Sequence, residues 1–330
     1  MGHDKPAIYF LCGLAWSALL LTFAGCSGGT TDEADSDKVA VTLQLDFYPE
    51  ASHGGFFQAK LKGYFADVGI DEVNIVSDGP MITPMQGVAL GKAQFGICRM
   101  DDLLMAIELG LPLKAVMATY QHDPLSIMFH ADQNIKSFED MDGRKLMAIP
   151  GAGFVSWIQR RYNLNLNLVP LNFDLSHFVS DSKMLQQAYI TSQPFYVEKK
   201  GVEVECLLLA DSGFDPMRVL YVNEKFATKH PVVVRDFAKA ALRGIEDYYI
   251  KGDRSETDAY LQSINVTNQP DLNDFTVATI EKYKLLTGRV EGGYPLGEIN
   301  LDRMREVMRI MVEIDLLKAP IPVEEYLFEP

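Results

Sequence analysis

The fold of this chain is decided by residues 43–67, which read LQLDFYPEASHGGFFQAKLKGYFAD. Apolar and polar residues alternate over 39–45, which predicts a β-strand. Residues 46–53 form a polar and aromatic loop, and residues 54–62 have helical spacing that stops at Gly63. A strand that leads through a short loop into a helix is the opening unit of an α/β fold.

The same alternation continues on both sides of the middle of the chain. The further strands that we predict are 73–76, 95–98, 113–118, 126–129, 146–149 and 207–210. The further helices that we predict are 85–90, 103–109, 135–141, 155–162, 232–249 and 301–316, together with an apolar helix before Thr191. Strands that alternate with helices predict mostly parallel sheets. We expect two α/β lobes, with 39–122 and 217–330 in lobe I and 123–216 in lobe II.

The first 38 residues have the pattern of an export signal. Ala7 to Ala24 is almost continuously apolar and is followed by Gly25, Cys26 and a polar stretch. We predict a lipoprotein signal peptide over 1–25, lipidation of Cys26 and a tether over 26–38, which places the protein outside the cytoplasm on a membrane. A single membrane-spanning anchor is the alternative, because about 20 apolar residues cross a bilayer.

Composition narrows the class of function. The chain carries a net charge of −15, whereas nucleic-acid binding needs a basic surface. With 48% hydrophobic and 23% charged residues, the composition is that of a globular protein. After Cys26 only Cys98 and Cys206 remain. They could form one disulfide, but both lie in predicted core strands, so we favour two free thiols. No cysteine and histidine spacing indicates a metal, and we expect no cofactor.

The loop after the first strand holds the best candidate binding residues. Phe47 or Tyr48 can stack on a flat ring, and Asp46 can accept hydrogen bonds from ring or exocyclic N–H groups. His53 precedes Gly54, where a bare backbone N–H at a helix start can meet an electronegative atom. The alternative is an aromatic loop that packs in the core, with His53 as a cap.

Weaker candidates lie further along the chain. The glycine-rich turn at Gly153 joins a strand to a helix, so its backbone can approach a ligand, or it is a plain tight turn. Thr191 and Ser192 offer compact donors and acceptors, or cap the turn before Pro194. Asp101 is a helix cap that could also face a cleft. Tyr189 lies beside the polar turn and is otherwise a core residue.

Several segments together resemble the ABC-transporter substrate-binding proteins related to thiamine-pyrimidine synthases. That family has a strand, Asp-Trp-x-Pro, a His-Ala-Gly-Phe type of helix start and Lys-Gly-Tyr-Phe, which residues 43–67 resemble. The resemblance continues through 91–96, 101–104, 110–113, 121–124 and 189–195, and it covers about residues 40–260. The order and the spacing of these segments are specific, although no single motif is.

The resemblance implies a type II periplasmic-binding-protein fold, in which two lobes close on a small ligand. It places Phe47 where the family has a ring-stacking Trp, with Asp46 before it and His53 at the first helix. It also gives Gln121 and the turn Thr191–Ser192 counterparts in the family's crossing segment and second lobe. The implied protein is a monomer that delivers a thiamine pyrimidine precursor, or a similar aromatic nitrogen heterocycle, to an ABC permease and its ATPase.

Two other functions compete with this interpretation. The same fold could bind a sulfonate or nitrate, but the predicted loops offer few basic residues besides Arg99. A thiamine-pyrimidine synthase would carry a cysteine-rich motif, and the corresponding residues 210–216 are ADSGFDP. No Gly-x-Ser-x-Gly or HExxH motif indicates a hydrolase. The sequence therefore predicts a binding protein and not an enzyme; whether it serves a permease or a sensor stays open.

Overall fold

The computed structural model describes residues 38–79 and 84–329. The predicted signal peptide, the predicted lipidation site Cys26 and the tether up to Asp37 lie outside the described residues. Within the described part, no helix combines the length and apolar character that crossing a membrane needs.

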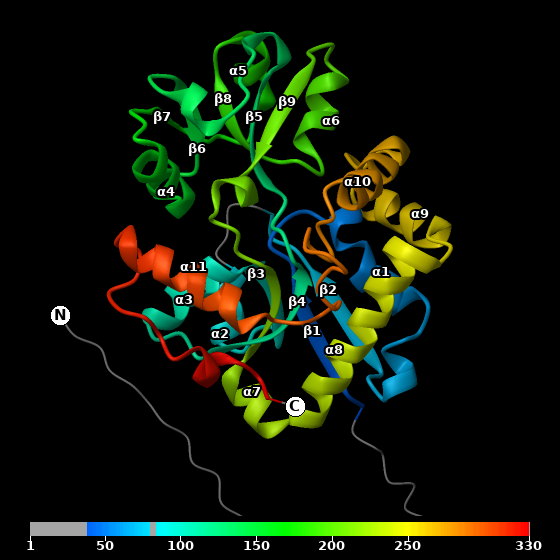
Figure 1. Ribbon diagram of the computed structural model, residues 1–330. Helices are drawn as coiled ribbons and strands as arrows, with labels where there is room; N and C mark the ends of the chain where they lie inside the picture. The colour runs from blue at the N-terminus through cyan, green and yellow to red at the C-terminus, as the bar shows by residue number, and fades with distance from the viewer. Residues whose placement is uncertain (1–37, 80–83, 330) are drawn as a thin grey trace, which may run out of the picture. The chain divides into compact units, whose positions relative to one another are not determined.

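The first lobe is built on a sheet with the strand order β2-β1-β3-β10-β4 (Figure 1). These strands are β1 (Ala40–Gln44), β2 (Glu72–Val76), β3 (Phe95–Arg99), β4 (Leu113–Tyr120) and β10 (Arg218–Asn223). The helices around it are α1 (Gly54–Leu61), α2 (Pro84–Ala89), α3 (Met100–Glu108), α7 (Glu224–Lys229), α8 (Pro231–Glu246), α9 (Ser255–Ile264), α10 (Pro270–Lys282) and α11 (Leu301–Glu313).

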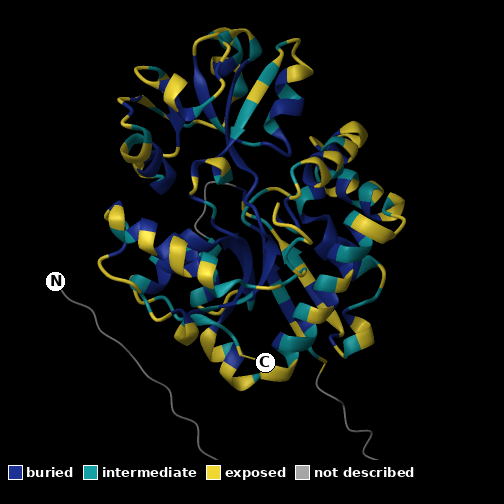
Figure 2. Cartoon of the chain, in the orientation of Figure 1, coloured by how far each residue is buried: buried dark blue, intermediate teal, exposed yellow. Residues whose placement is uncertain are grey.

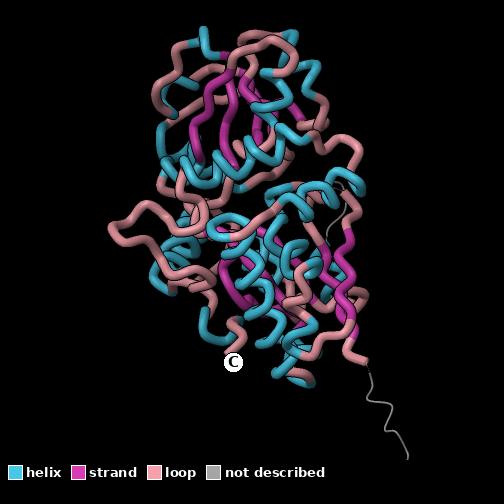
Figure 3. The backbone as a smooth tube through the Cα atoms, turned by 90° about the vertical axis from the view of Figure 1, so that its right-hand side faces the viewer, coloured by secondary structure: helices cyan, strands magenta, loops and turns pink. Residues whose placement is uncertain are grey.

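The second lobe has its own sheet, with the order β7-β6-β8-β5-β9. Its strands are β5 (Leu125–His130), β6 (Lys145–Ala148), β7 (Asn167–Pro170), β8 (Leu185–Tyr189) and β9 (Val204–Leu208). Its helices are α4 (Gly153–Tyr162), α5 (Leu175–Ser180) and α6 (Gln193–Glu198). Figure 3 shows the two sheets as separate groups of strands, so the predicted two-lobed α/β fold is confirmed.

One strand in each sheet runs against the others. In the first sheet β10 is antiparallel to both β3 and β4, and in the second β5 is antiparallel to both β8 and β9. The remaining neighbours β1–β2, β1–β3, β6–β7 and β6–β8 are parallel. Both exceptions are the first strand that the chain forms after it passes from one sheet to the other. The sheets are therefore mostly parallel, as predicted, with one reversed strand each.

Alternation along β10 explains how one sheet packs helices on both faces. Val219 and Tyr221 belong to the core formed with α3 and α11, whereas Leu220 and Val222 belong to the core formed with α1 and α8. Successive side chains of a strand point to opposite faces, so a strand that is covered on both sides is apolar throughout. Figure 2 shows inner strands such as β3, β5 and β10 buried and the outer helix faces exposed.

One predicted helix is shorter than expected and another is wrong. The short helix predicted over 135–141 is a 3-10 helix at Phe138–Met141, because a capping box between Ser137 and Asp140 starts it there, and Gly143 follows its end with a positive φ. The segment before Thr191 is the strand β8. It lies between β6 and β5, and its pairing with these two strands is a long-range feature that the segment LQQAY does not itself indicate.

The two cysteines of the lobes are free thiols in the structure. Cys98 is buried on β3 of the first sheet, and Cys206 is half-buried on β9 of the second. The preference for thiols over a disulfide is therefore confirmed. Burial raises the pKa of both thiols, which keeps them protonated and poorly reactive.

Helices α1 and α8 approach so closely that glycine is required at their contact. A Cβ built on Gly244 would meet the Gly55 carbonyl oxygen and would lie 2.6 Å from the Ala59 Cβ. We expect Gly244→Ala to lower the free energy of unfolding by about 1–3 kcal/mol, because overpacking outweighs the better helix propensity of alanine. Urea unfolding measures the change. Gly87→Ala in α2 is the control: it has open space and should gain up to about 1 kcal/mol.

Candidate functional site

A cavity of about 570 Å³ lies between the two lobes, within the size range of small-molecule sites. The first lobe lines it with Asp46, Phe47, Tyr48, Pro84, Met85, Ile97, Cys98, Arg99 and Asp102. The second lobe lines it with Leu125, Ile149, Leu171, Asn172, Phe173, Leu175, Gln186, Gln187, Ala188, Tyr189 and Gln193. Several of these residues stand at or just beyond the carboxyl ends of β1, β3 and β8, where α/β sheets bind ligands.

Aromatic rings from both lobes meet in this cavity. The ring centre of Phe47 lies 5.2 Å from that of Tyr48 and 6.0 Å from that of Tyr189 of the second lobe, both in edge-to-face geometry. The Phe47 carbonyl accepts a hydrogen bond of 2.6 Å from the Ser77 hydroxyl, which fixes the loop after β1. An aromatic wall held in this way can stack against a planar ligand.

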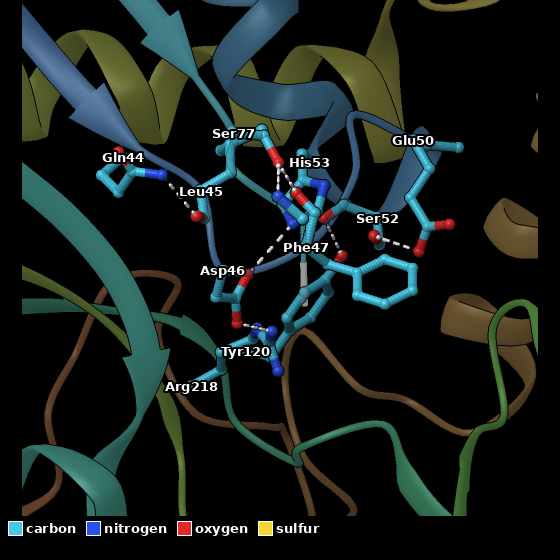
Figure 4. A network of polar contacts seen from close by, with 12 residues as sticks. Gln44, Leu45, Asp46, Phe47, Glu50, Ser52, His53, Ser77, Tyr120 and Arg218 are labelled. Atoms are coloured by element: carbon cyan, nitrogen blue, oxygen red, sulfur yellow. Dashed lines mark hydrogen bonds and ion pairs between the residues drawn. The ribbon is translucent and has the colours of Figure 1, made fainter. Parts of the chain in front are cut away.

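Asp46 is held between a cation and a histidine. Figure 4 shows its carboxylate paired with Arg218 on one side and facing His53 Nε2, 3.3 Å away, on the other. Burial disfavours the charge, but Arg218 and the hydrogen bond to His53 outweigh it and hold the pKa of Asp46 below its ordinary value. Asp46 is therefore a carboxylate at neutral pH, and its side chain is 15% exposed.

Arg218 contacts residues of both lobes. Its guanidinium donates to Asp46 and also to Asp123, at 2.8 Å, and it lies 5.3 Å from the ring centre of Tyr189. Arg99, which lines the cavity, donates to both oxygens of Asp101, at 2.9 and 2.8 Å. Both cations are therefore already neutralised by protein carboxylates.

Asp102 is the remaining carboxyl group of the lining. Burial and then repulsion from Asp101 raise its pKa to about 7. Counted with Asp46, Asp101 and Asp123, four carboxyl groups face the two guanidinium groups, so the described part of the site does not carry the positive charge that an anion requires.

The structure brings three predicted site residues into the cavity lining: Asp46, Phe47 and Tyr189. His53 is buried behind Asp46 and contacts it, and Asp101 lies beside the lining, held by Arg99.

The predicted turn after β8 lies next to the lining. Thr191 and Ser192 are buried, and the carbonyl of Thr191 accepts a hydrogen bond from Thr276. Ser192 stands at the start of α6, and the neighbouring Gln193 lines the cavity in its place.

Three further predicted site residues, Gly54, Gly153 and Gln121, are also absent from the lining. A Cβ on Gly54 would meet the ring of Tyr248, and a Cβ on Gly153 would meet Leu316, so both positions require close packing. Gln121 stands where the chain leaves the first sheet and accepts a hydrogen bond of 2.6 Å from Arg303.

Sequence reasoning missed Arg218, Asp102 and Gln186 as site residues. Arg218 had a signal, since it is the one charged residue in the apolar run 217–222. A charge buried in a strand needs partners, so this position could have been flagged as the counterpart of the carboxylates. Asp102 follows Asp101 at the same predicted helix start, and nothing local in the sequence distinguishes the two.

The described residues contain no group of three or more His, Cys, Asp or Glu side chains arranged to hold a metal ion. Asp46 and Asp101 are instead engaged by arginine and histidine.

Comparison with known proteins places this geometry among binding proteins. A family model described as NMT1/THI5 like matches residues 50–253. The riboflavin-binding protein RibY of Chloroflexus aurantiacus is 26% identical over 300 residues, which cover 86% of this chain and 84% of the relative. The formylaminopyrimidine-binding protein of Halalkalibacterium halodurans is 24% identical over 322 residues, which cover 93% of this chain and 94% of the relative.

Solved structures agree on the fold. The periplasmic aliphatic sulphonate binding protein SsuA of Escherichia coli superimposes with a TM-score of 0.68 at 12% identity, over 88% of this chain and 92% of that one. The alkanesulfonate-binding protein SsuA of Xanthomonas axonopodis, bound to MOPS, gives a TM-score of 0.64 at 12% identity, over 88% and 98%. At these identities the likeness concerns the fold alone.

Proposed function

The chain belongs to the NMT1/THI5-like family and is a solute-binding protein, and from this premise we propose that its solute is a small aromatic nitrogen heterocycle. The observation that carries the proposal is that Phe47 and Asp46, neighbours in the chain, both line the cavity, with Tyr189 of the second lobe in edge-to-face contact with Phe47. A ring can stack on Phe47 while its N–H groups donate to Asp46.

The named ligands of two relatives support the same class. One relative is named for riboflavin and the other for formylaminopyrimidine, and both compounds are aromatic nitrogen heterocycles. The cavity of about 570 Å³ leaves room for a single pyrimidine or for a larger fused ring. The protein would act without catalysis, as a monomer.

Capture by closure of the lobes fits the contacts between the crossing segments. Arg303 of α11 donates to Gln121 in the first crossing, at 2.6 Å, and to Asp215 in the return crossing, at 2.8 Å. His122 Nδ1 lies 2.6 Å from the same Asp215 carboxylate. These contacts join both crossings to one helix, and the proposed hinge turns about them. We place the lobe boundaries at these crossings, with 39–122 and 217–330 in lobe I and 123–216 in lobe II.

Delivery to a membrane permease and its ATPase completes the proposed function. The predicted lipid on Cys26 would hold the binding protein at the outer face of the membrane that contains the permease. A permease and ATPase gene pair beside this gene would distinguish transport from delivery to a sensor.

A thermal-shift panel tests the ligand class. The panel holds formylaminopyrimidine, hydroxymethylpyrimidine and riboflavin, with taurine, an alkanesulfonate and nitrate as anion controls. A ligand present at 100 times its Kd stabilises the folded state by about 2.7 kcal/mol, which raises Tm by about 5 to 10 °C. We expect this shift with at least one heterocycle. A shift with the anions alone would keep the fold and refute the ligand class.

A further inference from the structure

Two polar side chains line the cavity from opposite lobes, and each has an oxygen that no described residue hydrogen-bonds. Asp102 stands in the first turn of α3 and lines the cavity from the first lobe. Among the described residues nothing hydrogen-bonds to its carboxyl group or pairs with it, and its pKa responds only to burial and to charges at a distance. Both oxygens of the neighbouring Asp101 accept hydrogen bonds from Arg99. Asp101 is therefore already paired, whereas Asp102 is not paired by any residue that the structure describes.

Gln186 is the counterpart from the second lobe. It lies on β8, lines the same cavity and is 1% exposed. Its Oε1 is buried and has no hydrogen-bond donor among the described residues. A buried amide without a partner costs free energy, and proteins keep such a group mainly where something else completes it. The neighbouring Gln187 differs, since its Oε1 accepts from the Ile149 N–H at 2.9 Å.

Charged groups of both signs surround Asp102, but none of those that the structure describes forms a hydrogen bond or an ion pair with its carboxyl group. These groups are Asp101 and Arg99 beside it, Asp123 from the first crossing, Arg218 from β10, Asp46 from the loop after β1 and the thiol of Cys98. Arg99 and Arg218 are already bound to other carboxylates. The carboxyl oxygens of Asp102 are therefore free to accept hydrogen bonds from a ligand.

We propose that Asp102 and Gln186 form a two-sided specificity clamp, in which Asp102 accepts from an N–H edge of the ligand and Gln186 binds its opposite side. The clamp rests on the proposed function, because it acts on a heterocycle stacked at Phe47. It adds a requirement that stacking does not impose: the ring must present an N–H donor to the first lobe. Rings of the same size whose nitrogens are alkylated would be rejected.

The charge state of Asp102 makes the clamp sensitive to pH. Burial raises the pKa of Asp102 to about 7, and the ionised form accepts hydrogen bonds more strongly than the neutral form. A donor ligand binds the carboxylate and so lowers this pKa. Its affinity should therefore rise by up to about tenfold between about pH 6 and about pH 8 and then level off. A ligand that accepted a proton from Asp102 would show the opposite slope.

Titration calorimetry on the full-length chain, purified in a mild detergent, tests the clamp. One pair of probes is riboflavin and riboflavin methylated on its imide nitrogen. The other pair is hydroxymethylpyrimidine and the same ring with a dimethylated amino group. The wild type should bind at least one parent compound about tenfold to a hundredfold more tightly than its methylated partner. Asp102→Leu should abolish this preference, and Asp102→Asn should abolish the pH dependence.

Asp302→Asn is the matched control. Asp302 also lies in the first turn of a helix, but it is 93% exposed and pairs with Arg305 on the surface. It should leave the affinities and their pH dependence unchanged. The groups that surround Asp102 are the same in the wild type and in Asp102→Asn, so a difference in pH dependence between these two proteins isolates Asp102.

A second variant separates a ligand contact from a structural role. Gln186→Met removes the unpartnered amide at nearly the same volume. It should raise the Tm of the ligand-free protein, because the buried orphan is gone, and should lower affinity for the parent probe by about tenfold. If Gln186→Met loses both stability and affinity, Gln186 has a structural role, and its proposed contact with the ligand is refuted.

The remaining outcomes decide between the two proposals. If the wild type and Asp102→Leu discriminate equally between parent and methylated probes, the clamp is refuted while heterocycle binding stands. If the wild type binds parent and methylated probes alike, the clamp is refuted in the same way. If the wild type binds none of the four probes, the clamp and the proposed ligand class both fail.

Discussion

Replacing Arg218 with methionine should lower the free energy of unfolding by about 3–5 kcal/mol, which is the usual cost of removing one partner from a buried ionic network. Arg218 is buried and donates to Asp46 and to Asp123. Methionine fills much of the same volume but leaves two carboxylates without their cation. Thermal unfolding should show a fall in Tm of about 10 °C or more.

The loss of stability in Arg218→Met should depend on pH. In the wild type the pKa of Asp46 is below its ordinary value, so its contribution to stability is present at neutral pH and is lost as the pH falls through the folded pKa. Without Arg218 the buried carboxylate is disfavoured. The deficit of the variant should therefore be largest at neutral pH and should shrink toward about pH 4, where aspartate protonates.

Arg309→Met provides the control for this prediction. Arg309 pairs with Glu306 and Glu313 on the exposed face of α11, and a surface network of this kind contributes less than about 1 kcal/mol. Equal losses of stability in the two variants, or a deficit for Arg218→Met that does not change with pH, would contradict the role given to Arg218.

Phe47→Ala should weaken binding of an aromatic heterocycle by about tenfold to a hundredfold. Stacking of a heterocyclic base on an aromatic side chain contributes about 1–3 kcal/mol, and Phe47 follows Asp46 in the chain and lines the same cavity. Phe47→Leu keeps apolar contact but loses the flat face, so it should recover only part of the affinity. Phe47→Trp supplies a larger ring and should bind at least as tightly as the wild type. Titration calorimetry measures the series.

Leu90→Ala is the control for the ring series, since Leu90 is 75% exposed and lies outside the cavity lining. It should leave affinity unchanged. If Phe47→Ala and Leu90→Ala bind the same heterocycle equally well, the ligand does not stack at Phe47.

Local patterns in the sequence were sufficient for the elements that open the fold. The predicted strand over 39–45 and the predicted helix over 54–62 correspond to β1 at Ala40–Gln44 and α1 at Gly54–Leu61. The alternation of apolar residues and the helix stop at Gly63 are local features, so they were enough to predict both elements. The two successive series of alternating strands and helices then predict the two-lobed α/β fold.

Elements whose identity depends on neighbours were not predictable in this way. Residues 185–189 form β8 because they pair with β6 and β5, and this pairing cannot be deduced from the segment LQQAY alone. The site shows the same limit. Phe47 and Asp46 follow from the loop after β1, but the pairing of Asp46 with Arg218 joins residues 172 positions apart.

The choice between Asp101 and Asp102 illustrates how fine the distinction is. Both begin α3, and one residue of helix turns the side chain by about 100°. Asp101 therefore meets Arg99, and Asp102 meets the cavity. Only the three-dimensional position of β3 relative to the second lobe decides which carboxylate a ligand can reach.

A crystal structure of the full-length chain, grown with the heterocycle that gives the largest thermal shift, tests the central claim most directly. The account predicts the ring in the cavity between the lobes, against Phe47 and Tyr189, with an N–H edge at Asp46 or Asp102 and with no anion in the site. A heterocycle bound outside this cavity, or a cavity that holds a sulfonate or nitrate in its place, would contradict the account.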